Sequence, residues 1–269
     1  MSRGALPLRC DAPVLANDAC GGANRRLRLE VGAAFPPSGP GQFVMLSPGA
    51  LPAAPRFDPL LPRPMAVFRR EGAALEVLYK VTGRGTALLA AARGGDAVRV
   101  VGPLGRGFPL PAPGERAILV GGGTGIASLF DLAARAREGG PVLELLGARS
   151  GADLMARAEF EALGAPLRLA TEDGSAGRRG LVTELLEEAL AEAGPARVYA
   201  CGPTPMMQRA AELAAGAGRP CLASLENRMA CGFGVCLGCA VPRRGEGYAL
   251  VCRDGPVFGS EELRFEGLP

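Results

Sequence analysis

The sequence predicts an antiparallel β-barrel, then an α/β domain built on a parallel sheet, then a small C-terminal cysteine module. Over about the first 112 residues, short apolar stretches such as RLRLEV, GQFVMLS and ALEVLYKV recur between Gly- and Pro-rich turns, which is typical of a small barrel. Over residues 113–219, apolar strands alternate with Ala- and Leu-rich helices, which indicates a parallel sheet with crossover helices. Four closely spaced cysteines follow. We therefore expect three units, 1–112, 113–219 and 220–269.

The composition of the 269-residue chain excludes several classes of function. Its net charge is +3 and its basic residues are scattered, so we expect no nucleic-acid-binding face. No apolar run reaches the ~18–20 residues of a membrane span, and the first residues lack the apolar core of a secretory signal. We expect a cytoplasmic protein with no membrane contact. The chain has no histidine, which excludes imidazole as a general base when the chain acts alone.

The cysteine module carries the strongest signal. Cys231, Cys236, Cys239 and Cys252 have the spacing C-x4-C-x2-C, followed by twelve residues before the fourth cysteine. This pattern is typical of a [2Fe–2S] cluster held by four thiolates. The alternative is a non-redox interaction protein with a structural zinc site, but zinc ribbons usually use paired C-x2-C knuckles and only one such pair is present. We expect the remaining four cysteines to be free.

Two glycine turns in the α/β half predict a nucleotide site. Gly121–Gly125 follows the apolar strand AILV and opens a helix, where glycines allow the backbone to approach a pyrophosphate. The spacing GGGTG departs from G-x-G-x-x-G, so this turn alone fits either a dinucleotide or plain packing. A second turn, at Cys201-Gly202, ends another strand of the same sheet. Two such turns at strand C-termini form a crevice where ligands of open α/β sheets bind.

Two elements of the barrel half have a functional and a structural interpretation. Arg63 follows a Pro-rich segment, 47–62, which we expect to be a loop; its guanidinium suits a phosphate, or it is a surface arginine. Gly83–Thr86 precedes the helical run ALLAAA and either caps that helix or holds a phosphate. The residues alone leave both alternatives open.

Taken together, these elements resemble one family. The motifs R-P-x-x, L-Y-K, G-x-G-T, GPLG-x-GF, GGGTGI, TEDGS, CGP, ENRMACGFGVCLGC and VCRDGPVF occur in this order over essentially the whole chain. They resemble the electron-transfer subunit of NAD-dependent dihydroorotate dehydrogenase, within the ferredoxin-reductase superfamily. The resemblance implies a β-barrel FAD domain, an α/β NAD domain and a [2Fe–2S] module. It also implies an FMN-containing catalytic partner that oxidises dihydroorotate, in a heterotetramer of two of each.

The implied role is to pass electrons from the partner's FMN through the cluster and FAD to NAD, in pyrimidine biosynthesis. The protein would supply positioning, so no catalytic residue is assigned. A related subunit serving a different partner, such as an NAD(P)H-dependent ferredoxin oxidoreductase or a sulfhydrogenase, shares every motif and stays an alternative.

Carried over position by position, the resemblance implies contacts with FAD and with NAD. The family has serine where this chain has Ala66, so a hydroxyl contact near the flavin is lost. The acidic pair Glu172 and Asp173 would bind the cofactor ribose and repel a 2′-phosphate, which favours NAD over NADP; we interpret Arg149 as a solvated arginine. Cys201 either contacts the nicotinamide or is a buried, inert thiol. The implied FAD contacts are Arg63, Pro64, Met65, Ala66, Leu78, Tyr79, Lys80, Gly85 and Thr86, and the NAD contacts are Gly121, Gly122, Gly123, Thr124, Gly125, Glu172, Asp173, Cys201 and Gly202.

Overall fold

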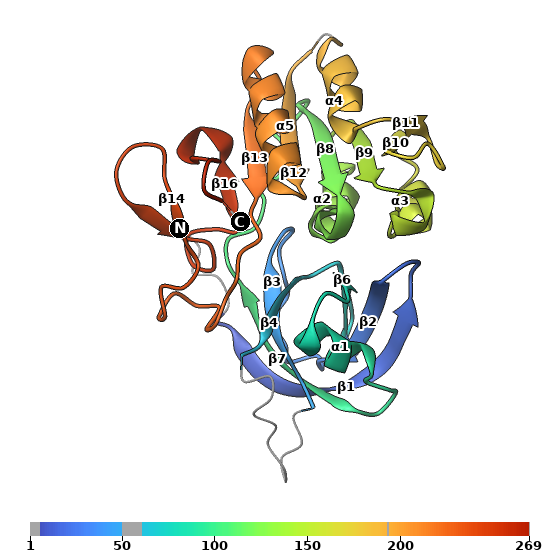
Figure 1. Cartoon of the computed structure of the whole chain (residues 1–269), viewed down its shortest axis with the longest axis vertical. Coiled ribbons are helices and arrows are strands. Elements are labelled where there is room, and N and C mark those ends of the chain that lie inside the picture. The colour runs from blue at the N-terminus through green and yellow to red at the C-terminus, as the bar shows by residue number, and fades with distance from the viewer. Residues whose placement is uncertain (1–5, 50–60, 193, 269) are drawn as a thin grey trace.

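The computed structural model describes residues 6–49, 61–192 and 194–268. Its first part is a seven-stranded antiparallel sheet that curls into the predicted barrel (Figure 1). The strand order is β4-β3-β7-β1-β2-β6-β5. The strands are β1 (Leu8–Ala19), β2 (Asn24–Glu30), β3 (Phe43–Pro48), β4 (Arg63–Ala66), β5 (Arg69–Glu71), β6 (Ala74–Lys80) and β7 (Ala97–Leu104), and the helix α1 (Arg84–Ala90) follows β6.

The barrel is held by alternating apolar residues that point inward. Leu27 and Leu29 on β2 and Val98 and Val100 on β7 are fully buried in one shared core. This alternation is the period-2 pattern expected of strands with one buried face. Of the expected loop at 47–62, residues 50–60 lie outside the described part of the chain, and the first two residues belong to β3.

The second part is the predicted parallel sheet, with order β11-β10-β9-β8-β12-β13-β16. The chain runs outward from β8 to β10 and then returns to β12, so the strand order reverses between β8 and β12. Helices α4 and α5 pack on one face and α2 and α3 on the other (Figure 1). The strands are β8 (Arg116–Gly122), β9 (Val142–Ala148), β10 (Leu167–Thr171), β11 (Arg178–Arg179), β12 (Ala196–Cys201) and β13 (Cys221–Ser224), and the helices are α2 (Ile126–Ala136), α3 (Arg157–Leu163), α4 (Val182–Leu190) and α5 (Thr204–Gly216).

The cysteine module begins after β13 and returns to the same sheet. A hairpin of β14 (Ala240–Pro242) and β15 (Tyr248–Leu250) leads to β16 (Val257–Gly259), which pairs antiparallel with β13 at the sheet edge. Cys239, Cys252 and the apolar residues of the module continue the core beneath α4 and α5. The module is therefore packed against the α/β domain, and the exact divisions after residues 112 and 219 stay predictions. None of the helices in the described ranges has the length and apolar character needed to cross a membrane.

The barrel and the α/β domain meet through a common apolar core. Phe68 and Phe108 from the barrel side pack with Phe130 of α2 and Tyr199 of β12. The Phe68 and Phe130 rings lie 4.5 Å apart, and Phe108 meets Tyr199 edge-on at 5.6 Å. Because these side chains are buried on both sides of the junction, the two parts have a defined mutual position.

Candidate cofactor sites

A cavity of about 660 Å³ lies where the order of the parallel strands reverses. The ends of β8 and β12 meet there, with Gly121 opposite Cys201 in the register of the two strands. Four predicted nucleotide contacts from the two glycine turns line the cavity, namely Gly122, Gly123, Thr124 and Gly202. The crevice at the switch point of an open α/β sheet is the usual site of a dinucleotide, and the cavity matches that position.

Three predicted residues, Gly121, Gly125 and Cys201, are not among the residues that line the cavity. The Cα of Gly125 lies so close to the backbone of Cys201 that an added methyl group would approach its carbonyl oxygen to 2.4 Å. Cys201 is only 1% exposed, and burial raises the pKa of its thiol to about 12. The Cys201 thiol is therefore protonated at neutral pH and is a poor nucleophile.

The acidic pair after β10 does not act as a pair. Glu172 lines the cavity, whereas Asp173 does not. The Asp173 carboxylate accepts hydrogen bonds from the backbone N–H of Ser175 (2.9 Å) and its hydroxyl (2.6 Å), and these bonds lower the pKa of Asp173. Arg149, interpreted from the sequence as a solvated arginine, is exposed but also lines the cavity, as does Arg209 of α5. The cavity thus presents both charge signs to a ligand.

Further cavity residues were not expected from the sequence. Asn24 of the barrel and Asp153 of the η2 turn (Gly151–Asp153) line it, together with Lys80, which was assigned to FAD. Glu226 also lines it, and the Thr124 hydroxyl donates to its carboxylate at 3.4 Å. Glu226 is the first residue of the motif ENRMAC, so the sequence contained a motif that could have pointed to this residue. Asn24 and Asp153 lie far apart in the sequence, and only the packed domains bring them together.

The predicted flavin-phosphate residues Arg63 and Gly85 are brought into direct contact. A methyl group added at Gly85 would lie 2.4–2.6 Å from the Arg63 guanidinium, so this position has no room for a side chain. The Thr86 hydroxyl accepts from the N–H groups of Thr82 (2.9 Å) and Gly83 (3.1 Å) and donates to the Gly83 carbonyl (2.9 Å). Thr86 therefore caps α1. The Arg63 guanidinium lies against the backbone of Gly85, and this arrangement suits an anionic group.

The remaining flavin assignments lie on β4 and β6. Leu78 packs into the core shared with the α/β domain, and Ala66 lies against it. Tyr79 points to the opposite face, where it is 1% exposed and its hydroxyl donates to Asn17 at 3.0 Å. Alternation along a strand explains this, since neighbouring side chains leave on opposite faces. Tyr79 can therefore meet a ligand on the Leu78 face only through its backbone.

The four predicted cluster ligands come together as two pairs. The Cys239 and Cys252 sulfurs lie 3.2 Å apart and both residues are buried, while the Cys231 and Cys236 side chains contact each other nearer the surface. Burial opposes ionisation of Cys231, but hydrogen bonds from the backbone N–H groups of Cys236 and its neighbours outweigh it and lower its pKa to about 6. Within the described part of the chain, no three acidic or cysteine side chains are arranged to hold a single metal ion. Two thiol pairs suit a two-iron cluster, in which each iron takes two protein ligands.

The cluster loop rests on the barrel. Gly232 lies against Met45 of β3, where an added methyl group would reach the Met45 side chain at 2.5 Å. Met45 in turn pairs with Pro64 of β4, which belongs to the implied flavin motif. The outer side of the loop exposes Phe233, Val235 and Leu237.

The fold and these sites define a ferredoxin-reductase-like oxidoreductase with an iron–sulfur module. Residues 226–264 match the iron–sulfur cluster binding domain of dihydroorotate dehydrogenase B, and residues 119–212 match the oxidoreductase NAD-binding domain. The chain is 42% identical over 232 residues to the "Dihydroorotate dehydrogenase B (NAD(+)), electron transfer subunit" of Bacillus caldolyticus, covering 83% of this chain and 86% of that protein. The subunit of the same name from Caldanaerobacter subterraneus is 41% identical, with 84% and 87% covered.

Solved structures share the fold of the chain. An NADH-dependent reduced ferredoxin-NADP oxidoreductase superposes with a TM-score of 0.83 at 28% identity, covering 100% of this chain and 93% of that chain. The ferredoxin reductase of carbazole 1,9a-dioxygenase shares the fold, with a TM-score of 0.66 at 23% identity, covering 80% and 67% of the two chains. The chain belongs to the family of electron transfer subunits of dihydroorotate dehydrogenase B, as its motifs predicted. It is an oxidoreductase subunit, and the cofactor prediction of FAD, a [2Fe–2S] cluster and NAD agrees with these matches.

Proposed function

We propose that this chain transfers electrons from the FMN of a dihydroorotate-oxidising subunit, through its own cluster and FAD, to NAD in pyrimidine biosynthesis. The observation that carries the proposal is the position of the barrel. Asn24 and Lys80 of the barrel help to form the dinucleotide cavity, while Met45 on another barrel strand contacts the cluster loop. A flavin held by β4, β6 and α1 would therefore lie between the two other redox sites.

The chemistry explains why three cofactors are needed. NAD accepts hydride, a [2Fe–2S] cluster passes single electrons, and a flavin exchanges both, so FAD supplies the conversion when bound. The residues of this chain bind and orient the cofactors. Arg63 beside Gly85 offers a cationic fork to the flavin phosphates, and the turn Gly122–Thr124 offers backbone N–H groups to the NAD pyrophosphate. The thiolates of Cys231, Cys236, Cys239 and Cys252 would hold the cluster.

The exposed side of the cluster loop is the surface proposed to meet the catalytic subunit. Phe233, Val235 and Leu237 are 54%, 74% and 62% exposed, and Tyr248 on the adjacent hairpin is 75% exposed. Clustered exposed apolar residues mark interaction surfaces. An FMN subunit docked here would bring its flavin next to the cluster, which is the entry point of the proposed electron path. The heterotetramer of two copies of each subunit is part of this proposal.

Reconstitution tests the proposal. The purified chain should reduce an artificial dye with NADH but should not oxidise dihydroorotate, and addition of the FMN subunit should restore dihydroorotate-dependent NAD reduction. Val235→Asp should weaken that coupled activity at least about tenfold, because it places a charge in an apolar interface. It should leave dye reduction intact. Leu15→Asp, at a leucine 46% exposed on β1 outside the module, is the matched control.

Two results would contradict the proposal. Oxidation of dihydroorotate by the partner-free chain would overturn the division of labour. Dye reduction that stays intact while the reconstituted pair remains inactive would instead favour a different partner, as in the ferredoxin oxidoreductase alternative.

A further inference from the structure

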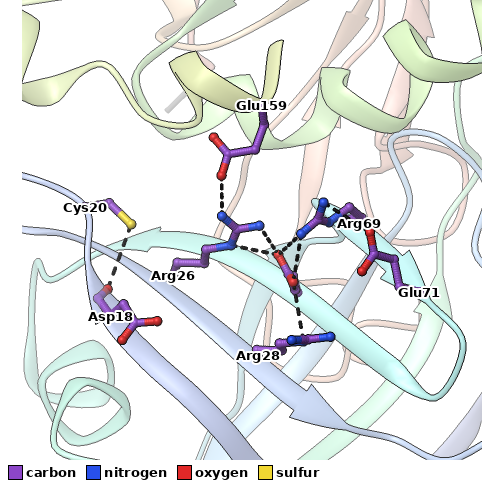
Figure 2. A network of polar contacts seen from close by, with 8 residues as sticks. Asp18, Cys20, Arg26, Arg28, Arg69, Glu71 and Glu159 are labelled. Carbon is purple, nitrogen blue, oxygen red and sulfur yellow. Dashed lines mark hydrogen bonds and ion pairs between the residues drawn. The ribbon is translucent and has the colours of Figure 1, made fainter. Parts of the chain in front are cut away.

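A group of charged residues joins the barrel to the α/β domain outside the cofactor sites (Figure 2). At its centre is Glu76 of β6, which is only 4% exposed. Its carboxylate accepts from Arg26 at 2.7 Å and from Arg69 at 3.2 Å, and Arg28 lies 3.5 Å away. Three guanidinium groups surround this one buried carboxylate, and Arg69 also pairs with Glu71 at 3.1 Å.

Arg26 also contacts a carboxylate of the other domain. Its second terminal nitrogen donates to Glu159 of α3. In Figure 2, Glu159 extends from its helix directly onto Arg26, which projects from the barrel. The two side chains are 23% and 25% exposed, so solvent screens this pair less than it would a fully exposed one. The contact is therefore an ion pair between the domain that holds the flavin strands and the domain that holds the NAD cavity.

An aromatic stack crosses the junction beneath the ion pair. The Arg26 guanidinium lies 5.3 Å from the centre of the Phe68 ring. Phe68 packs on Phe130 at 4.5 Å, and Phe130 meets Phe160 edge-on at 5.2 Å. Phe160 is the neighbour of Glu159 on α3. The helix α3 is thus attached to the barrel in two ways. The aromatic contacts hold α3 near the barrel, and the directional ion pair fixes the position of α3 along the barrel surface.

The ion pair lies close to residues that line the dinucleotide cavity. In the register of β2 and β6, Arg26 is opposite Leu78, and Asn24 is opposite Lys80. Asn24 and Lys80 line the dinucleotide cavity, and so does Asp153, which is in the turn before α3. A tilt of α3 against β2 would therefore move the cavity wall relative to the implied flavin strand.

We propose that the Arg26–Glu159 pair is a positioning latch that sets the α/β domain against the flavin strand, so that bound NADH meets the flavin in reactive geometry. The inference rests on the proposed function. In the reaction concerned, a hydride leaves NADH, which becomes NAD⁺, and both its electrons and its proton pass to FAD, giving the reduced flavin anion. Reacting atoms must lie about 3–3.5 Å apart, and a shift of about 1 Å costs up to about 100-fold in rate.

The test compares Glu159→Gln with Glu161→Gln. Glu161 lies on the same helix but is exposed and pairs with Arg157 of that helix, so its loss leaves the domain junction untouched. Anaerobic single-turnover reduction of the flavin is followed at several NADH concentrations, which separates the hydride-transfer rate from NADH affinity. The long-wavelength charge-transfer absorption of the nicotinamide–flavin complex reports their stacking without turnover, and a thermal melt reports stability.

For Glu159→Gln we expect about a tenfold slower hydride transfer and a weaker charge-transfer band, with the NADH dissociation constant within about twofold. FAD and iron content should be unchanged, Glu161→Gln should match wild type, and Glu159→Asp should lie between.

Three outcomes would overturn the latch. One is a Glu159→Gln rate within about twofold of wild type with a normal charge-transfer band. Another is a lower melting temperature with an unchanged rate, which would mean that the pair only stabilises the junction. If Glu159→Gln loses its flavin, Glu159→Asp decides, and a wild-type rate of hydride transfer in Glu159→Asp refutes the latch. Failure of NADH to reduce the wild-type flavin would contradict the proposed function itself, which separates the two tests.

Discussion

Glu144 of β9 is a carboxyl group buried within the parallel sheet that ionises only at alkaline pH, and its replacement by glutamine should stabilise the protein there. Its side chain is 0% exposed, on the strand face that it shares with Val142 and Leu146. Neither carboxylate oxygen has a hydrogen-bond partner within the described residues. Burial raises the pKa of Glu144 from 4.5 to about 8, and the positive charge of Arg137 offsets this only in part.

The sign of the pH effect follows from the direction of this shift. The folded state binds the proton more tightly than the unfolded chain, so the stabilising contribution is complete below pH 4.5 and is lost as the pH rises through about 8. One pKa unit corresponds to about 1.4 kcal/mol, so the loss between pH about 5 and about 8.5 is at most about 4 kcal/mol. Local relaxation and water entry reduce such penalties, and we expect about 2 kcal/mol.

Thermal melts of wild type and Glu144→Gln at both pH values measure this effect. The variant should melt about 5 °C higher than wild type at pH about 8.5 and within about 1–2 °C of it at pH about 5, since about 1 kcal/mol shifts the melting temperature by about 2–4 °C in a chain of this size. Glu138→Gln, at an exposed residue after α2, should show no such pH dependence. An equal difference between wild type and Glu144→Gln at both pH values would refute the reasoning.

Two further predictions concern the cofactor sites. Cys239→Ser should remove the visible and paramagnetic signals of the cluster while the flavin absorption persists, because Cys239 is buried against Cys252 and no histidine is available to replace it; a normal cluster in this variant would show that the ligand set is wrong. NADH should reduce the flavin faster than NADPH, and Glu172→Gln should narrow the difference, because this carboxylate faces the cavity and would repel a 2′-phosphate. A preference of wild type for NADPH would mean that Arg149 binds that phosphate instead.

The cysteine spacing, the glycine turns and the hydrophobic periodicity predicted the features of this protein that depend on residues close together in the sequence. Cys231, Cys236 and Cys239 lie within one short loop, so their spacing alone brings three of the four predicted ligands together. The glycine turns after β8 and β12 met as expected, because the ends of neighbouring parallel strands share one edge. The fold class followed from the change of hydrophobic period along the chain.

The contacts that the sequence did not predict depend on side-chain direction or on the packing of two domains. Asp173 turns away from the cavity because Ser175, two residues later, donates two hydrogen bonds to its carboxylate. The sequence Asp-Gly-Ser alone does not show whether the carboxylate forms this local turn or binds a ligand. Glu159 meets Arg26 only after the barrel and α3 have packed. No spacing along one chain encodes a contact of that kind.

The central claim is that one chain couples a two-electron carrier to a one-electron carrier. An anaerobic reductive titration of the purified chain, followed by visible absorption and electron paramagnetic resonance, tests it most directly. FAD takes two electrons and the cluster one, so we predict about three electrons per chain, NADH as an effective donor, and one paramagnetic reduced cluster per chain. Uptake of only two electrons by a chain that contains zinc and no iron would contradict the account.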